Sequence, residues 1–458
     1  MPPRLPCLLS APPAAEGRLW LTNATLFDGT GAPAHDAAAV LVEHGRIARV
    51  GRAGDPVPDG ASEVDLDGRT LMPGLIDAHA HAYGTMPQPP LGTEPIRPGT
   101  EGHFLAAALR DALRMGITTM RDVGSYGDQV FEARQSMRYG ALRGPRLLTC
   151  GRIVSATSPG GRFFERMYRE ADGADDMRRA VREQVRRGAD FIKVMTTGAR
   201  TVELEDPDPA QLTREEITTL VDEVHRLGYR VAAHAEGLDG TELAVEAGID
   251  TIEHGMYLNQ RPELLERMAA TGQVLVPTFG CFYGVAGLGD RIGFGDVDAE
   301  PAAPSADTPP PTWTHLLVDL AFHNLAEADR TLKAARAAGV PIATGHDWAP
   351  LSDLGLEILR MINHGLSTRE ALVASTATAA HALGLADHIG TITPGKLADL
   401  LVVDGDPLQQ PALLRQRDRI WLVLQLGEPV AGAALENDVI RGPGVTSAQS
   451  PDNIVSPH

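Results

Sequence analysis

The pattern of apolar and polar residues divides the chain into two kinds of region. Residues 17–72 contain short apolar stretches with alternating polar residues, separated by His-Gly, Asp-Gly and Pro-Gly pairs. The same pattern returns near the end, in GTITPGKLADLLVVDGDP and RIWLVLQLGEPV. Alternation between turn-forming pairs is typical of antiparallel strands. We therefore expect both chain ends, residues 17–74 and 386–440, to form one small β-sandwich domain.

Between these ends, short apolar runs alternate with longer amphipathic segments. Eight runs are candidate strands: LIDAHAHA, TTMRDVG, RLLTCGRIVS, FIKVMTTG, RVAAHAEG, TIEHG, VLVPTFG and PIATGHD. Segments such as DDMRRAVREQVRRGA and TREEITTLVDEVHRLG have the helical period, and several helical segments end near a glycine, as helices often do. Eight strand–helix repeats predict an α/β fold, a (β/α)8 TIM barrel over residues 75–385.

Three long segments follow predicted strands, at residues 83–101, 156–173 and 279–316. In a barrel they would lie at the catalytic face, where long loops are commonly lids or disordered segments. Residues 1–16 and 441–458 are expected to be tails.

Composition excludes some classes of partner. The 458 residues carry a net charge of -19, which argues against nucleic acid, since phosphate binding needs basic patches. Cys7, Cys150 and Cys281 are too far apart for a cysteine zinc site. No run is long enough for a membrane span or a signal-peptide core. We expect a cytoplasmic protein with neither a nucleic-acid nor a membrane partner.

Ligand-capable side chains recur toward the ends of the predicted barrel strands. In a strand, residues i and i+2 share a face, so the first two histidines of the set project together. A lone histidine is usually a core residue and a lone aspartate can cap a helix, but packing gives no reason for five strands to share this feature. Histidines with a carboxylate are a metal-site composition. The set comprises His79, His81, Lys193, His234, His254 and Asp347.

Lys193 lies within the apolar strand FIKVM, where an unpaired charge is costly. Its neutral amine could react with carbon dioxide to give a carbamate that bridges two metal ions. Alternatively, its ammonium could form an ion pair with Glu236. Strand position alone leaves both interpretations open.

The motifs LMPGLIDAHAH, EADGADDMRRAVREQVRRGADFIKVMTTG, AHAEG, IEHG, PIATGHD and GTITPGKLADLLVVDGDP together resemble the amidohydrolase superfamily. The resemblance extends from about residue 18 to 435. It is strongest to the binuclear-metal branch of imidazolonepropionase-like proteins, Xaa-Pro and Xaa-Arg dipeptidases and ochratoxin-type amidases.

The resemblance implies two divalent metal ions, usually zinc. His79 and His81 would hold the more buried ion, and His234 and His254 the other. N6-carboxylated Lys193 would bridge the ions together with a hydroxide. Asp347 would contact the buried ion and act as the catalytic proton acceptor and donor. A homo-oligomer is also implied.

The expected activity is hydrolysis of an amide or peptide bond in a dipeptide, an N-acyl amino acid or an ochratoxin-type amide. Alternatives are hydrolysis of a carbamate, thiocarbamate or lactone at the same site, a one-metal deaminase or imidazolonepropionase, and a non-catalytic metal-binding barrel.

Substrate residues are less clearly marked. Arg200 could bind a substrate carboxylate or be a solvated arginine. By position alone, three further residues could either line the substrate pocket or serve only in packing: Tyr257, His346 and Trp348.

Overall fold

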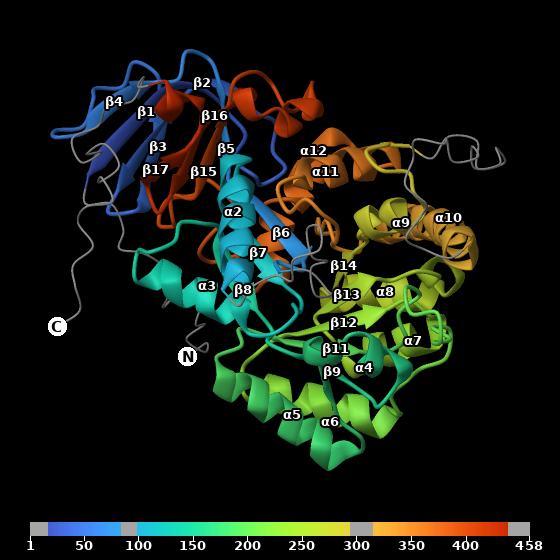
Figure 1. The fold of residues 1–458 in the computed structure, drawn as a ribbon. Coiled ribbons are helices and arrows are strands. Elements are labelled where there is room, and N and C mark those ends of the chain that lie inside the picture. The colour runs from blue at the N-terminus through green and yellow to red at the C-terminus, as the bar shows by residue number, and fades with distance from the viewer. Residues whose placement is uncertain (1–16, 84–98, 294–314, 438–458) are drawn as a thin grey trace, which may run out of the picture.

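The computed structural model describes residues 17–83, 99–293 and 315–437 (Figure 1). Both predicted tails therefore lie outside the described residues, as do most of the predicted loop 83–101 and residues 294–314 of the loop 279–316. In Figure 1, a sheet built from both chain ends lies beside a second region, in which parallel strands are surrounded by helices.

Both chain ends contribute to one eight-stranded sheet. Its order is β17-β16-β15-β5-β1-β2-β3, and β4 pairs with β1. Antiparallel pairing of β5 with β15 joins the two ends, with Leu401 opposite Met72. The strands are β1 (Arg18–Leu26), β2 (His35–Glu43), β3 (Arg46–Arg52), β4 (Ser62–Asp65), β5 (Thr70–Pro73), β15 (Leu400–Val403), β16 (Ile420–Gln425) and β17 (Glu428–Ala431).

Apolar packing also unites the two ends. Val40, Leu71 and Val402 are fully buried in one cluster, although they come from opposite ends of the chain. This cluster is separate from the larger one between the parallel strands and their helices. Burying these side chains together stabilises the pairing of the two ends.

The remaining strands pair in parallel, in the orders β6-β7-β8 and β10-β9-β11-β12-β13-β14. Most of these strands are buried along their whole length, as expected when helices cover the sheet. They are β6 (Leu75–Ala80), β7 (Ile117–Asp122), β8 (Arg146–Thr149), β9 (Ile153–Ser155), β10 (Tyr168–Glu170), β11 (Ile192–Met195), β12 (Val231–Ala235), β13 (Thr251–His254) and β14 (Val274–Val276).

The structure differs from the prediction at two of the eight strands. The third is divided into β8 and β9, and Gly151 between them has a φ of 72°, which favours glycine. The eighth, residues 341–347, is not a regular strand but has backbone hydrogen bonds on both sides. Ala343 N–H donates to Leu275 of β14 (2.9 Å), and Ala78 N–H of β6 donates to Thr344 (2.9 Å). This segment therefore connects the end of the longer parallel sheet to β6.

Helices follow the strands, as the amphipathic segments predict. In α5 the buried residues are Met177, Ala180, Val181 and Gln184, which share one helical face, and the helix ends at Gly188. The helices are α2 (Thr100–Arg114), α3 (Gln129–Arg138), α4 (Pro159–Phe163), α5 (Ala174–Arg187), α6 (Arg214–Arg226), α7 (Leu238–Ala247), α8 (Pro262–Thr271), α9 (Phe279–Val285), α10 (His315–Ala338), α11 (Leu354–Asn363), α12 (Thr368–Ala374), α13 (Ala377–Ala382) and α14 (Ala433–Glu436). Short 3-10 helices are η1 (Glu165–Met167), η2 (Leu258–Gln260), η3 (Pro411–Arg415) and η4 (Arg417–Arg419).

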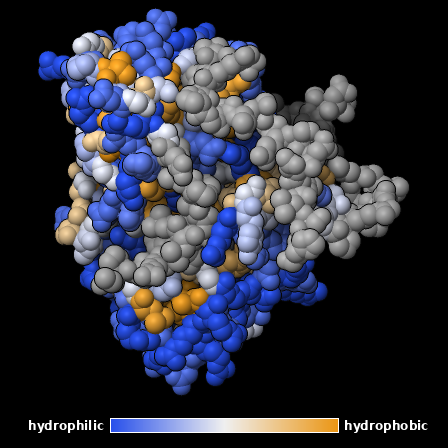
Figure 2. All heavy atoms as spheres, turned by 90° about the vertical axis from the view of Figure 1, so that its left-hand side faces the viewer, coloured by the Kyte–Doolittle hydropathy of each residue, from blue (hydrophilic) through white to orange (hydrophobic). Residues whose placement is uncertain are grey.

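The face of the molecule drawn in Figure 2 is largely hydrophilic, with hydrophobic residues in small patches. Within the described ranges, no helix is both long and apolar enough to cross a membrane.

Candidate metal and catalytic site

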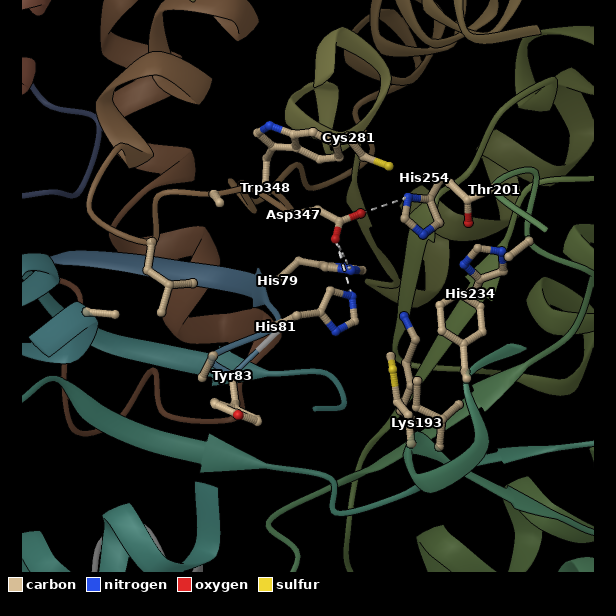
Figure 3. A pocket seen from close by; sticks show the side chains of 18 of the residues that line it. His79, His81, Tyr83, Lys193, Thr201, His234, His254, Cys281, Asp347 and Trp348 are labelled. Atoms are coloured by element: carbon tan, nitrogen blue, oxygen red, sulfur yellow. Dashed lines mark ion pairs between the residues drawn. The ribbon is translucent and has the colours of Figure 1, made fainter. Parts of the chain in front are cut away.

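All six side chains predicted as metal ligands line one pocket. They come from β6, β11, β12 and β13, from the residue after β6 and from the segment 341–347, and Figure 3 shows them directed toward a common space. The register explains part of this arrangement, because Met195 of β11 lies beside His234 of β12, and Ala235 lies beside His254 of β13. Parallel strands therefore end together and present their last side chains to the same volume.

Asp347 lies between the histidines. One carboxylate oxygen, Oδ1, is 3.3 Å from His81 Nε2 and 3.5 Å from His79 Nε2. The other, Oδ2, is 3.9 Å from His254 Nδ1. The ring centroids of His234 and His254 are 4.6 Å apart. One carboxylate thus faces imidazoles from two strands.

Among the residues that the structure describes, two groups of donors are compact enough to hold an ion. One is His79 with His254 and Asp347, and the other is His234 with Glu236 and His254. Within each group, one possible ligand atom from every residue lies within 4.8 Å of the others. Imidazole and carboxylate donors suit zinc and similar divalent ions, so the residues fit a metal site.

The protonation of three of the histidines also fits, whereas for His81 the effect of burial is outweighed by the hydrogen bond and the charge of Asp347, which raise its pKa. Burial lowers the pKa of His234 to about 3 and that of His254 well below its ordinary value. Burial also lowers the pKa of His79. These imidazoles are therefore neutral at pH 7, which is the form that binds a metal.

Three of the rings are oriented through their second nitrogen. His79 Nδ1–H donates to Glu253 Oε2 (2.7 Å), and His81 Nδ1–H donates to the carbonyl of Gly124. His254 Nδ1 forms a hydrogen bond with Thr278 Oγ1 (2.7 Å). Each bond fixes the ring and leaves Nε2 available, as is usual for metal-binding histidines.

Glu253 belongs to a buried charged network beneath the site. Its Oε1 accepts a hydrogen bond from Arg121 Nη2 (2.8 Å), and Arg121 Nε donates to the carbonyl of Ala78 (2.6 Å). Burial alone would raise the pKa of Glu253, but the charges of Arg121 and Lys193 outweigh it and hold the pKa well below its usual range. An ionised Glu253 therefore fixes His79. The sequence analysis did not identify Glu253 or Arg121, although a charged residue within a buried strand was a signal for both.

Lys193 lies on the inner side of its strand. Ile192 and Val194 pack in the cluster between strands and helices, whereas Phe191 and Met195 belong to a different cluster. Alternation along the strand accounts for this difference, and it places Lys193 on the side of Phe191 and Met195. Its side chain lines the pocket and is only 2% exposed.

The amine of Lys193 is buried without a hydrogen-bond partner in the described part of the chain. Burial lowers its pKa to about 8. The carboxylate considered as its partner, that of Glu236, instead accepts the backbone N–H of Arg200 (2.7 Å). The structure therefore does not form the predicted alternative ion pair of Lys193 with Glu236.

Three residues at the site also have a strained backbone. His254, Thr278 and Asp347 have φ values of 66°, 52° and 48°, in the left-handed region that non-glycine residues rarely adopt. Each such residue costs about 1–3 kcal/mol, and such strain is common at functional sites.

A model of the amidohydrolase family matches residues 70–430. The chain belongs to the amidohydrolase family. Among curated relatives, ochratoxinase from Aspergillus niger is 29% identical over 451 residues, covering 92% of this chain and 86% of that protein. Imidazolonepropionase from Paracoccus denitrificans is 28% identical over 425 residues, covering 83% of this chain and 90% of that protein.

Solved structures agree with this assignment. The crystal structure of A. niger ochratoxinase superposes with a TM-score of 0.77 at 26% identity, covering 91% of this chain and 96% of that chain. A Xaa-Pro dipeptidase with bound methionine in its active site has the same TM-score at 24% identity, covering 91% of this chain and 100% of that chain. The neighbours identify an α/β TIM-barrel fold, and the family with its ochratoxinase relative supports a hydrolase acting on amide bonds.

The amidohydrolase pocket has a volume of about 680 Å³. Of the four predicted substrate residues, Trp348 lines it. Arg200 is outside the described lining, since its Nη2 pairs with Asp208 Oδ1 (2.5 Å) and its guanidinium lies 5.4 Å from the Tyr257 ring centroid.

His346 and Tyr257 are also outside the described lining. His346 is 2% exposed and packs behind α9. A Cβ added to Gly280 of this helix would lie 1.9 Å from the carbonyl oxygen of His346. Sequence position alone could not show that these two side chains lie away from the pocket.

Glu236 was predicted as an alternative partner for Lys193 and was not among the predicted metal ligands. In the structure Glu236 lines the pocket, 3.8 Å from His234 Nε2. Burial raises the pKa of Glu236 to about 7, against the opposing effect of Arg200. Its position two residues after His234, on the same face of the strand, was the available signal.

Proposed function

We propose that this protein is a metal-dependent amidohydrolase that cleaves an amide or peptide bond. The observation that carries the proposal is the position of Asp347, whose two carboxylate oxygens face His79, His81 and His254. The name of the A. niger relative, ochratoxinase, and the dipeptidase title of the structural neighbour are consistent with this reaction class.

Two ions would share this set of donors. His79 and His81 would hold one ion together with Asp347, and His234 and His254 would hold the other. Divalent ions bound there would lower the pKa of water and polarise the substrate carbonyl. Zinc suits these nitrogen and oxygen donors.

Lys193 would supply the group shared by the two ions. Its neutral amine nitrogen attacks the carbon of carbon dioxide and releases one proton to solvent, which leaves an N-carboxylate with one negative charge. Two features support this step: the amine is buried, and it has no hydrogen-bond partner among the residues described. The product would be an anionic oxygen donor in place of a buried cation.

Asp347 would move the proton during hydrolysis. Burial acts to raise its pKa, but the neighbouring His79, His81 and Lys193 outweigh burial and lower the pKa to about 2. Its carboxylate is therefore ionised at pH 7 and can accept a proton from the attacking water. The same oxygen would donate this proton to the leaving nitrogen, since an amine leaves more easily than its anion.

We further infer the domain division that positions this site. The backbone hydrogen bonds of residues 341–347 to β14 and β6 support closure of eight strands into a barrel over residues 75–385. The pairing of β5 with β15 supports a small second domain from residues 17–74 and 386–440.

The test is turnover by zinc-loaded protein on a panel of dipeptides, N-acyl amino acids and aromatic amides. Asp347→Asn should lower kcat by at least about 1,000-fold, because it removes the proton acceptor and donor. The control Asp222→Asn changes an exposed aspartate on α6 and should keep full activity. Near-normal turnover by Asp347→Asn would reject this role.

A further inference from the structure

The walls above the metal ligands are strongly apolar. They are formed by α2, by α4 with η1, and by the segment that follows Asp347. Aromatic side chains dominate these walls: Tyr83, Phe104, Phe163, Phe164, Tyr168 and Trp348. Aliphatic residues such as Leu105, Met167 and Leu351 fill the spaces between them.

Three of these aromatic side chains are unusually exposed. Phe104 is 42%, Phe163 is 40% and Trp348 is 37% exposed. In the described ranges only four other large hydrophobic side chains are comparably exposed, and none of them lines this pocket. Exposed apolar side chains that gather at one cavity indicate a binding surface, since each could otherwise be buried or replaced by a polar residue.

The aromatic walls are also ordered by their own packing. Phe163 and Phe164 meet edge to face at 4.7 Å between ring centroids, and Phe164 lies 5.2 Å from Tyr168. On the wall formed by the segment after Asp347, a Cβ added to Gly284 would lie 2.2 Å from Cε2 of Trp348. The indole therefore rests directly on α9 at a glycine, and Figure 3 shows it beside Asp347.

The described lining of the pocket contains more carboxylates than lysine and arginine side chains. Lys193 is its single lysine or arginine, and Lys193 lies among the metal ligands. Carboxylates of Asp111 and Glu236 also line the pocket. Arg200, which could have bound a substrate carboxylate, is paired with Asp208. Against these described walls, a substrate carboxylate would therefore be desolvated without a cation from the lining residues named here, which is unfavourable.

We propose that the substrate is a neutral amide with a bulky aromatic or apolar group, and that a free carboxylate beside the scissile bond is selected against. The inference rests on the proposed amide hydrolysis and adds the substrate class. A cavity of about 680 Å³ lies within the range for ligands of drug size. The aromatic walls supply affinity through apolar burial and ring contacts.

The test compares three amides that differ at one position. N-benzoyl-phenethylamine has hydrogen where N-benzoyl-phenylalaninamide has a neutral carboxamide and N-benzoyl-phenylalanine has a carboxylate. With zinc-loaded wild-type protein, kcat/KM for both neutral compounds should exceed that for the acid by at least about tenfold, equivalent to about 1.4 kcal/mol. Equal or faster cleavage of the acid overturns the substrate class while leaving amide hydrolysis intact.

Binding provides a readout that does not need turnover. Calorimetry on zinc-loaded Asp347→Asn should show tighter binding of N-benzoyl-phenethylamine than of the acid. Adding Phe163→Ala or Trp348→Ala to this protein should weaken binding of the neutral compound several-fold. Tyr139→Ala is the matched control, since this aromatic residue is 77% exposed but lies outside the described lining.

The outcomes separate the two proposals. Selective binding of the neutral amide without cleavage of any amide by the wild type would reject the proposed function and keep the binding preference. Unchanged binding in both aromatic variants, with Tyr139→Ala as reference, would reject the aromatic walls as the binding surface. Cleavage confined to small or charged amides would also reject the substrate class.

Discussion

The floor and the walls of the pocket are built in different ways. The floor consists of side chains on or just after buried parallel strands, and charged residues such as Glu253 and Arg121 hold it from below. The walls consist of aromatic side chains on helices, on β10 and on connecting segments, and several of these side chains are partly exposed. A rigid floor suits chemistry that requires fixed distances, whereas we propose that the walls select the substrate.

Glu253→Gln should have a larger effect than a change to a wall, because it acts on the floor. The amide can still accept from His79, but the negative charge beside Arg121 is lost. Loss of such a partner typically lowers metal affinity or activity by about 10–100-fold. Breaking a buried ion pair lowers the free energy of unfolding by about 3–5 kcal/mol. The hydrogen bonds of glutamine should recover part of this stability.

Zinc titration and thermal unfolding of Glu253→Gln measure both effects. The matched control is Glu266→Gln, which changes an exposed glutamate on α8. Wild-type zinc affinity with a reduced Tm would show that Glu253 contributes only to folding and would remove it from the metal site.

Gly284→Ala should have a smaller and more selective effect, because it acts on a wall. The new Cβ must displace the indole of Trp348, while the helical backbone at this position accepts alanine. We expect kcat/KM to fall several-fold for bulky aromatic amides. It should change little for small amides such as N-methylacetamide. Steady-state kinetics on both substrate types measures the difference.

Gly102→Ala is the control for this wall variant. Gly102 lies in α2 with no atom near the position of an added Cβ, so alanine there should stabilise the protein by about 0.5–1 kcal/mol without changing selectivity. If Gly284→Ala lowers kcat/KM equally for large and small substrates, then Trp348 supports the floor and does not select the substrate.

The contrast between floor and walls also explains which residues of the site could be predicted from the sequence. His79, His81, His234 and His254 were identifiable because apolar strands place polar residues at a shared end, and the structure brings these residues together. The spacing of residues in a strand is local, so the face of each side chain follows directly from the sequence.

The residues that sequence analysis missed depend on tertiary packing. Whether Arg200 points into the pocket depends on Asp208 and Tyr257, and nothing in the local pattern shows that they attract its guanidinium away. Phe104 and Phe163 come from segments far apart in the chain that meet only in the folded protein. The division of the third strand at Gly151 likewise depends on how its two halves pair with different neighbours.

The central claim is that six side chains hold two metal ions and that Lys193 bridges them as a carbamate. The most direct measurement is a crystal structure of zinc-loaded protein with anomalous scattering at the zinc edge. Our account predicts two zinc peaks contacted by His79, His81, His234, His254 and Asp347, with carbamate-shaped density on the Lys193 amine. A single peak, or an unmodified Lys193 paired with Glu236, would contradict it.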